Sequence, residues 1–275
     1  MKFKAKLADE TVNVSKVHPL KEFTTLIIGF SILLAILLIL ASSFANIVAP
    51  LVPLKTEKRI FSGLKTDSVN ENFFGLGKVS PSNELKALVD KLAKHWPQNP
   101  YDFSVAVLDS NEINAMALPG GTIIVSSGLL DIVDSENELA FVLAHEIGHF
   151  HNRDHLKGLG RGLLSSLVLG IVGGQSSKAL NSVVSTLSVS SYSRQDEARA
   201  DRFGLELVQA QYGDVSGSTD LFKKLAENED STLLERYTRS HPISKIRIQE
   251  MMDYADKQHW LRKEKLLPAL IINFD

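Results

Sequence analysis

A stretch of 32 uncharged residues, from Phe23 to Leu54, constrains this chain more than any other feature. Its apolar core, residues 26–49, would be about 36 Å long as a helix, enough to cross a hydrocarbon layer of about 30 Å. The stretch is too long for an ordinary core helix, and it begins too late for a cleaved signal peptide. We therefore predict one transmembrane anchor, residues 26–52, which contacts the lipid bilayer through residues 26–49.

The anchor divides the chain into a short tail and a large domain. We predict a polar tail over residues 1–25, a connector over 53–80 and one folded domain over 81–275. Lysines lie on both sides of the anchor, so the positive-inside rule does not decide its orientation. A short tail, one span and a large domain are typical of a signal anchor. We therefore expect a single-pass protein with a cytoplasmic tail and an extracytoplasmic, periplasmic domain.

Composition excludes several kinds of site. The 275 residues include no Cys and carry a formal net charge of −2. A chain without Cys has no disulfide, no thiolate metal site and no Cys nucleophile. The near-neutral charge, without a run of Lys and Arg interleaved with aromatic residues, argues against a nucleic-acid partner. Any metal must therefore be held by His and carboxylate side chains.

The segment between residues 81 and 126 is expected to form a helix and a small sheet. Leucine and valine at helical spacing follow Ser82, and alternating or β-branched runs predict strands within 101–109, 113–118 and 122–126. The last two strands flank a Pro-Gly-Gly turn and would form a hairpin. One strand could also border a cleft, where an extended peptide would add to its edge through main-chain hydrogen bonds.

The sequence His145-Glu146-Ile147-Gly148-His149 lies in a predicted helix that starts at the capping pattern of Ser135 and Glu138. Two His side chains four residues apart share one helical face and can reach one metal ion, and the Glu between them can hold a water beside it. His151 and His155 follow. We expect both to be surface residues or outer polar groups, because His151 points about 200° away from His149 around the helix.

A second polar segment supplies carboxylates. Residues 193–201 read as the start of a helix in which Glu197 and Asp201 share one face, and the small Ala198 and Ala200 would let it approach another helix closely. One carboxylate would complete a three-ligand metal site, and the other would accept a hydrogen bond from a ligating His. The intervening residues 162–193 are predicted to form two packed or membrane-touching helices, since each uncharged piece is too short to span a bilayer.

These blocks resemble the family of membrane-associated zinc metallopeptidases that includes HtpX and the CAAX prenyl endopeptidases. The resemblance covers roughly residues 75–250. It rests on His-Glu-Ile-Gly-His and the later Ser-Arg-x-x-Glu-x-x-Ala-Asp, together with Asn114-Ala115, Leu118-Pro119-Gly120-Gly121, Gly128-Leu129-Leu130 and His241-Pro242 with Arg247. Integral-membrane relatives have a hairpin of membrane spans between the two ligand blocks. Here that region holds only the short apolar pieces of residues 162–193, which favours the single-anchor or peripheral branch of the family.

The resemblance implies an α+β, mainly α, gluzincin-like zinc peptidase domain with a small sheet, preceded by one transmembrane helix. It implies one Zn²⁺ per chain held by His145, His149 and Glu197, with Asp201 behind a ligand. It also implies a zinc-activated water, with Glu146 as catalytic acid and base. The expected substrates are misfolded or membrane-associated polypeptides, and the expected role is quality control of membrane or envelope proteins.

The remaining polar residues are candidates for contacts with the substrate. His241 is the first candidate to stabilise the tetrahedral oxyanion; Tyr192, Arg247 and Asn114 are further candidates for oxyanion or substrate contacts. His241 could instead occupy the open metal position as a self-inhibitory gate, or it could be a helix-entry His without a role in the site. The alternative function is a catalytically silent or self-inhibited, membrane-anchored chaperone or binding module on the same fold.

Overall fold

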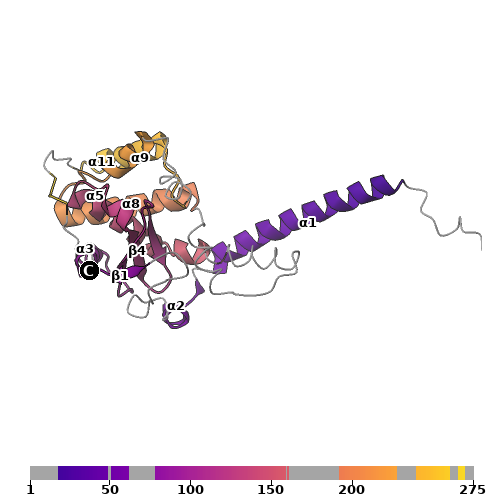
Figure 1. The fold of residues 1–275 in the computed structure, drawn as a ribbon, viewed down its shortest axis with the longest axis horizontal. Helices are drawn as coiled ribbons and strands as arrows, with labels where there is room; N and C mark the ends of the chain where they lie inside the picture. The colour runs from indigo at the N-terminus through magenta and orange to yellow at the C-terminus, as the bar shows by residue number, and fades with distance from the viewer. Residues whose placement is uncertain are drawn as a thin grey trace, which may run out of the picture.

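The computed structural model describes residues 18–48, 51–61, 78–158, 160, 192–227, 240–260 and 266–269. A long helix, α1 (Pro19–Val48), projects away from the body that holds the other elements (Figure 1). Large apolar side chains along it, such as Leu26 and Phe44, are exposed. Among the described residues, Pro19–Leu40 is the segment long and apolar enough to cross a membrane. The predicted anchor is therefore present as one candidate membrane helix, which begins upstream of the apolar core.

A four-stranded mixed sheet forms one layer of the body. Its strands are β1 (Val79–Pro81), β2 (Ser104–Leu108), β3 (Ala115–Leu118) and β4 (Thr122–Ser126), in the order β1-β2-β4-β3. The pairs β1–β2 and β3–β4 are antiparallel, and β2–β4 is parallel. The predicted hairpin is thus confirmed, and its first strand, β3, lies at an edge of the sheet.

Helices pack against this sheet and against one another. The described helices of the body are α2 (Leu54–Ile60), α3 (Asn83–Ala93), α4 (Ser127–Leu130), α5 (Glu136–His151), α8 (Arg194–Tyr212), α9 (Asp220–Glu227) and α11 (Lys245–Lys257). Helix α5 contacts α3, β3 and α8, and it lies beside α8 in Figure 1. Every residue of α5 from Asn137 to Phe150 is buried, and Phe141, Phe150 and Phe222 are among the largest fully buried side chains.

Local sequence signals set the starts of these helices. Ser82 and Ser135 cap α3 and α5 by accepting backbone N–H bonds from Leu85 and Glu138. The Glu138 carboxylate accepts from the N–H of Asp134 instead of from the capping serine, so the predicted box is displaced by one residue.

The predicted α+β, mainly α, class with a small sheet is confirmed. Residues 1–17 of the expected polar tail and the segment 162–191 lie outside the described residues. Residues 19–25, also expected in the tail, form the first part of α1, so the helix begins seven residues before the predicted start of the anchor at residue 26. Part of the expected connector, Leu54–Ile60, is the helix α2.

Candidate metal centre

Small residues bring the two motif helices together. A Cβ atom built on Gly148 of α5 would lie 2.8 Å from both Cα and O of Ala200 in α8. One built on Gly204 would lie 3.1 Å from the backbone nitrogen of His145. Neither Gly has a positive φ, so they are required here by the close backbone approach. This approach places the carboxylates of α8 directly beside the histidines of α5.

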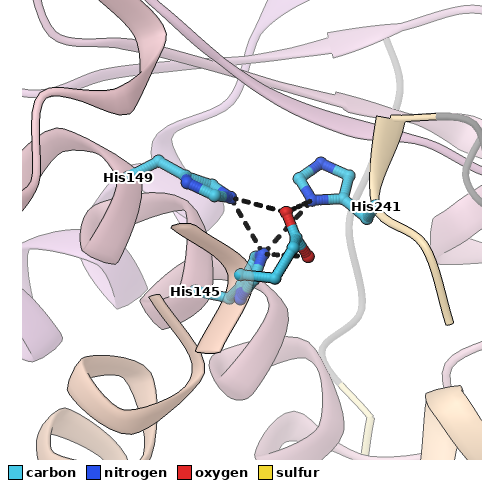
Figure 2. Close-up of side chains that lie close together, drawn as sticks. His145, His149 and His241 are labelled. Atoms are coloured by element: carbon cyan, nitrogen blue, oxygen red, sulfur yellow. Dashed lines mark hydrogen bonds and ion pairs between the residues drawn. The ribbon is translucent and has the colours of Figure 1, made fainter. Parts of the chain in front are cut away.

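Four side chains meet at this crossing, as Figure 2 shows for His145, His149 and His241. His145 Nε2 lies 3.1 Å from His149 Nε2 and 3.2 Å from His241 Nδ1. Glu197 Oε1 lies 3.1 Å from His241 Nδ1 and 3.5 Å from His149 Nε2. All four side chains are buried, and one ligand atom from each lies within 4.8 Å of the others.

These separations fit a tetrahedral metal ion. Zinc bonds of about 2.0–2.1 Å imply ligand atoms about 3.4 Å apart along a tetrahedral edge. The separations among the imidazole nitrogens, and between these nitrogens and the Glu197 oxygens, are 3.1 to 3.6 Å and lie around that value. Imidazole and carboxylate donors suit zinc and other first-row divalent ions. The residues present therefore fit a bound divalent metal.

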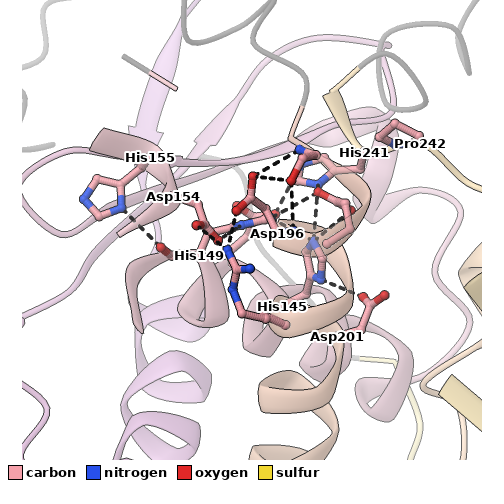
Figure 3. Close-up of polar contacts among 12 residues, drawn as sticks. His145, His149, Asp154, His155, Asp196, Asp201, His241 and Pro242 are labelled. Atoms are coloured by element: carbon pink, nitrogen blue, oxygen red, sulfur yellow. Dashed lines mark hydrogen bonds and ion pairs between the residues drawn. The ribbon is translucent and has the colours of Figure 1, made fainter. Parts of the chain in front are cut away.

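A carboxylate lies behind each histidine of the motif (Figure 3). His145 Nδ1 is 2.9 Å from Asp201 Oδ1, and His149 Nδ1 is 3.2 Å from Asp154 Oδ2. Such partners fix the ring orientation and the tautomer that leaves Nε2 as the metal ligand. The helical spacing predicts Asp201 in this position, whereas the sequence pattern does not indicate Asp154. It lies beyond the end of α5, where helical periodicity no longer indicates which way a side chain points.

Arg247 connects both carboxylates of α8. Its Nε and Nη2 each donate to Asp201 at 2.7 Å, its Nη1 lies 2.5 Å from Glu197 Oε2, and it also donates to the carbonyl of Pro242. A bidentate guanidinium of this kind fixes carboxylate geometry. These contacts favour a role for Arg247 in positioning the two carboxylates. They do not favour its predicted role in contacting an oxyanion.

The electrostatics of the cluster favour positive charge between the carboxylates. Burial raises the pKa of Glu197, but His241 and Arg247 outweigh burial and hold it well below its ordinary range. Burial lowers the pKa of His149, yet the carboxylates of Asp154 and Glu197 raise it to about 10. The hydrogen bonds of His149 and Lys157 likewise outweigh burial and hold the pKa of Asp154 at about 2. Glu197 and Asp154 are therefore ionised at neutral pH, as a metal ligand or its partner must be.

Glu146 is the exception among the polar groups of the site. Its side chain is fully buried, and neither carboxylate oxygen has a hydrogen-bond partner among the described residues. Its nearest ionic neighbour is His241, whose Nε2 lies 3.6 Å from Glu146 Oε1. Buried carboxylates are costly unless they are hydrogen-bonded, so this one is suited to a water or substrate group beside the metal ligands.

Of the remaining candidates, Tyr192 contacts a residue of the cluster directly. The Tyr192 ring stacks on His149 with centroids 3.8 Å apart. Asn114, just before the edge strand β3, is buried, and its Oδ1 has no hydrogen-bond partner among the described residues. His151 is exposed and stacks on Phe203. His155 is fully buried, so a surface position is wrong for it.

A groove opens beside Glu197, between the first turns of α8 and α11. It has a volume of about 430 Å³. Its lining combines the apolar Ile243 and Ile246 with the charged Arg194 and Arg202. The groove leaves a space next to Glu197, a member of the candidate metal cluster.

Sequence comparisons agree with this geometry. The family model described as peptidase family M48 matches residues 80–255. Metalloprotease LoiP of Escherichia coli (strain K12) is 28% identical over 187 residues, which cover 64% of this chain and 73% of LoiP. The beta-barrel assembly-enhancing protease of the same strain is 25% identical over 189 residues, covering 63% of this chain and 38% of that protein. Mitochondrial metalloendopeptidase OMA1 of Arabidopsis thaliana is 30% identical over 146 residues, covering 53% of this chain and 30% of that protein.

The matched regions are well under half of the last two relatives, so the activities of those whole proteins are not carried over. The comparisons confirm the resemblance to metallopeptidases that the sequence motifs indicated. The matched region also contains the four clustered side chains and Glu146. On this basis the chain is a peptidase, and it belongs to peptidase family M48.

Proposed function

We propose that the protein is a membrane-anchored zinc metalloendopeptidase that hydrolyses peptide bonds at the cluster of His145, His149 and Glu197. These three side chains would hold one zinc ion, with Asp201 and Asp154 orienting the histidines. When bound, the ion supplies Lewis acidity: it lowers the pKa of a coordinated water to about 7 and polarises a carbonyl. The proposal is supported by the match between the ligand separations and a tetrahedral site.

The observation that carries the proposed chemistry is the state of Glu146. A buried carboxylate without a hydrogen-bond partner in the described structure, next to four metal-ligand atoms, has the position that a general base needs. Glu146 would take a proton from the attacking water and then deliver it to the leaving amine. Both transfers use the same carboxylate, so one residue serves as base and then as acid.

His241 has two roles that fit its contacts. Its Nδ1 lies 3.2 Å from His145 Nε2 and 3.1 Å from Glu197 Oε1, which suits a fourth metal ligand that would exclude water in this conformation. Its Nε2 lies 3.6 Å from Glu146 Oε1, and from this side the ring, once moved out of the ligand position, could donate a hydrogen bond to the oxyanion. If His241 is a fourth metal ligand, the protein would be a self-inhibited peptidase or, as the alternative, a catalytically silent binding module.

The substrate would be a polypeptide that adds to the edge strand β3. The side-chain amide of Asn114 precedes that edge and offers a polar contact, while Tyr192 and Arg247 border the site. By its name, one relative is a protease that enhances beta-barrel assembly. We therefore propose misfolded or membrane-associated envelope proteins as substrates, in quality control. The peptidase domain would be extracytoplasmic and attached through α1.

The test is the Glu146→Gln variant of the full chain in detergent. We expect bound zinc to stay at one ion per chain, while cleavage of an unfolded protein such as casein is lost. Glu227→Gln is the matched control, because this exposed carboxylate ends α9 away from the cluster, and it should cleave like the wild type. Cleavage by Glu146→Gln would contradict the mechanism, and a wild type that binds zinc without cleaving would favour the binding module.

A further inference from the structure

A second buried carboxylate, Glu57, lies outside the metal cluster. It belongs to α2, which follows the anchor helix α1 after only five intervening residues. The side chain is fully buried in a seven-residue helix whose other residues are exposed or half-buried. Buried Glu is rare unless it is paired, so this helix is bound to the peptidase body through a specific contact.

The partners of Glu57 come from three separate parts of the body. Its carboxylate accepts hydrogen bonds from the backbone N–H of Gly120 at 3.0 Å, from the Tyr101 hydroxyl at 3.2 Å and from Arg153 Nη2 at 2.7 Å. The ring Nε2 of His155 lies 2.9 Å away. Burial alone raises the pKa of Glu57, but these partners outweigh burial and hold it at about 2. The carboxylate is therefore ionised and fully satisfied.

Neighbouring contacts extend this attachment along the segment 52–61. Arg153 also donates to the backbone carbonyl of Val52, and Lys58 donates to that of Pro100 at 2.9 Å. At the end of α2, Phe61 packs on the turn between β3 and β4, where a Cβ on Gly120 would lie 3.3 Å from Phe61 Cβ. The segment is thus bound both to the hairpin that carries the edge strand and to the end of α5.

The contacts at the end of α5 lead to the metal cluster. Arg153 has a positive φ of 56°, which is costly for a residue with a side chain, and its guanidinium is held by Glu57 and Val52. This turn is followed by Asp154, whose carboxylate lies behind His149 (Figure 3). On the other side of Asp154, His155 bridges Glu57 and the backbone carbonyl of His149. The two residues that flank Asp154 in the chain are therefore both held by Glu57.

We propose that the juxtamembrane segment 52–61 is a positioning element of the metal centre: Glu57 holds the turn that presents Asp154 to His149. The catalytic unit would then begin at residue 52, directly after the anchor, and not at residue 81. This inference rests on the proposed metal-dependent function, and Glu57 acts through other residues without touching the ligands.

The experiment measures metal affinity of the full chain in detergent, with Co²⁺ as the probe and a competing chelator, well below the unfolding temperature. Asp154→Asn removes the direct partner of His149 and should weaken affinity about 10- to 100-fold. Glu57→Gln keeps the shape but removes the charge, and should weaken affinity about 2- to 30-fold. Tyr101→Phe is the matched control, because it removes a Glu57 contact that does not lead to Asp154.

The double variant decides whether the effect passes through Asp154. If it does, Glu57→Gln combined with Asp154→Asn weakens Co²⁺ binding by less than the product of the two single effects. The Co²⁺ absorption spectrum should change in Glu57→Gln and stay unchanged in Tyr101→Phe. If Glu57→Gln does not fold, Arg153→Gly replaces it, since Gly tolerates the positive φ while the guanidinium is lost.

Two outcomes would overturn the inference alone: unchanged Co²⁺ affinity in a folded Glu57→Gln chain, even with a lower melting temperature, or effects that multiply fully in the double variant. A wild-type chain that binds neither Co²⁺ nor Zn²⁺ would overturn the proposed function, and the inference with it.

Discussion

The crossing of α5 and α8 offers the sharpest test of how the fold positions the proposed metal ligands. Gly148 lies next to His149 in α5, and it faces Ala200, three residues after Glu197 in α8. In Gly148→Ala the new Cβ would lie 2.8 Å from backbone atoms of Ala200, whereas ordinary contact begins at 3.4 Å. Since the obstacle is backbone, no side-chain rotation relieves it, and the helices must separate by about 0.6 Å.

The magnitudes separate stability from metal binding. Overpacking of this kind costs about 1–3 kcal/mol, but Ala in a helix interior is about 1 kcal/mol better than Gly. The net loss in free energy of unfolding is therefore about 0–2 kcal/mol. The separation of 0.6 Å exceeds the tolerance of about 0.2 Å for metal–ligand bonds, and it moves Glu197 away from His149, which is already 3.5 Å from it. We expect zinc affinity to fall at least about 10-fold.

The assay compares chemical unfolding and competitive zinc titration for wild type, Gly148→Ala and Gly213→Ala. Gly213 ends α8 with a φ of 72°, and a Cβ there would meet nothing within 4 Å. The strain of a left-handed Ala costs about 1–2 kcal/mol without moving the ligands. Gly213→Ala should therefore lose stability at unchanged zinc affinity. Wild-type zinc affinity in a folded Gly148→Ala chain would refute the reasoning.

Two further predictions follow from the buried polar groups. His241→Ala should abolish casein cleavage if the ring serves the oxyanion, and should increase it if the ring excludes water as a fourth ligand; unchanged cleavage would remove His241 from both roles. The pKa of Glu57 is about 2 in the folded protein, against an ordinary value of 4.5. Its ionised form therefore stabilises the fold by about 3 kcal/mol above pH 4.5, and this contribution is lost as the pH falls toward 2. The difference in unfolding free energy between wild type and Glu57→Gln should therefore narrow over that range; a constant difference would contradict the assignment.

Periodic patterns made the elements around the site predictable. The capping serines Ser82 and Ser135 and the Pro-Gly-Gly turn act within a few residues, so they mark α3, α5 and the β3–β4 hairpin locally. Helical periodicity, which is also a local property, places His145 and His149 on one face of α5, and Glu197 and Asp201 on one face of α8. Pairing these two faces required the family resemblance, since no local signal says which helices pack together.

Other features depend on contacts between distant segments. Asp154 lies beyond the periodic part of α5, and Glu57 lies inside the expected connector. At such positions a single acidic residue is predicted to be solvated. Only the positive φ of Arg153 and the packing of α2 turn them toward the interior. Likewise, the bidentate contact of Arg247 with Asp201 joins residues 46 positions apart, so its positioning geometry was not visible in the order of residues.

The sequence by itself determined the long apolar helix, the mainly α class with its small sheet, and the residue types of the candidate metal site, because each depends on short-range periodicity or on the chemistry of single side chains. The tertiary structure decided which carboxylate lies behind each histidine, that Glu146 is buried without a hydrogen-bond partner among the described residues, and that the segment after α1 packs into the body. Such facts arise when burial forces each polar group to find its partner across the fold, and a linear sequence does not specify those distances.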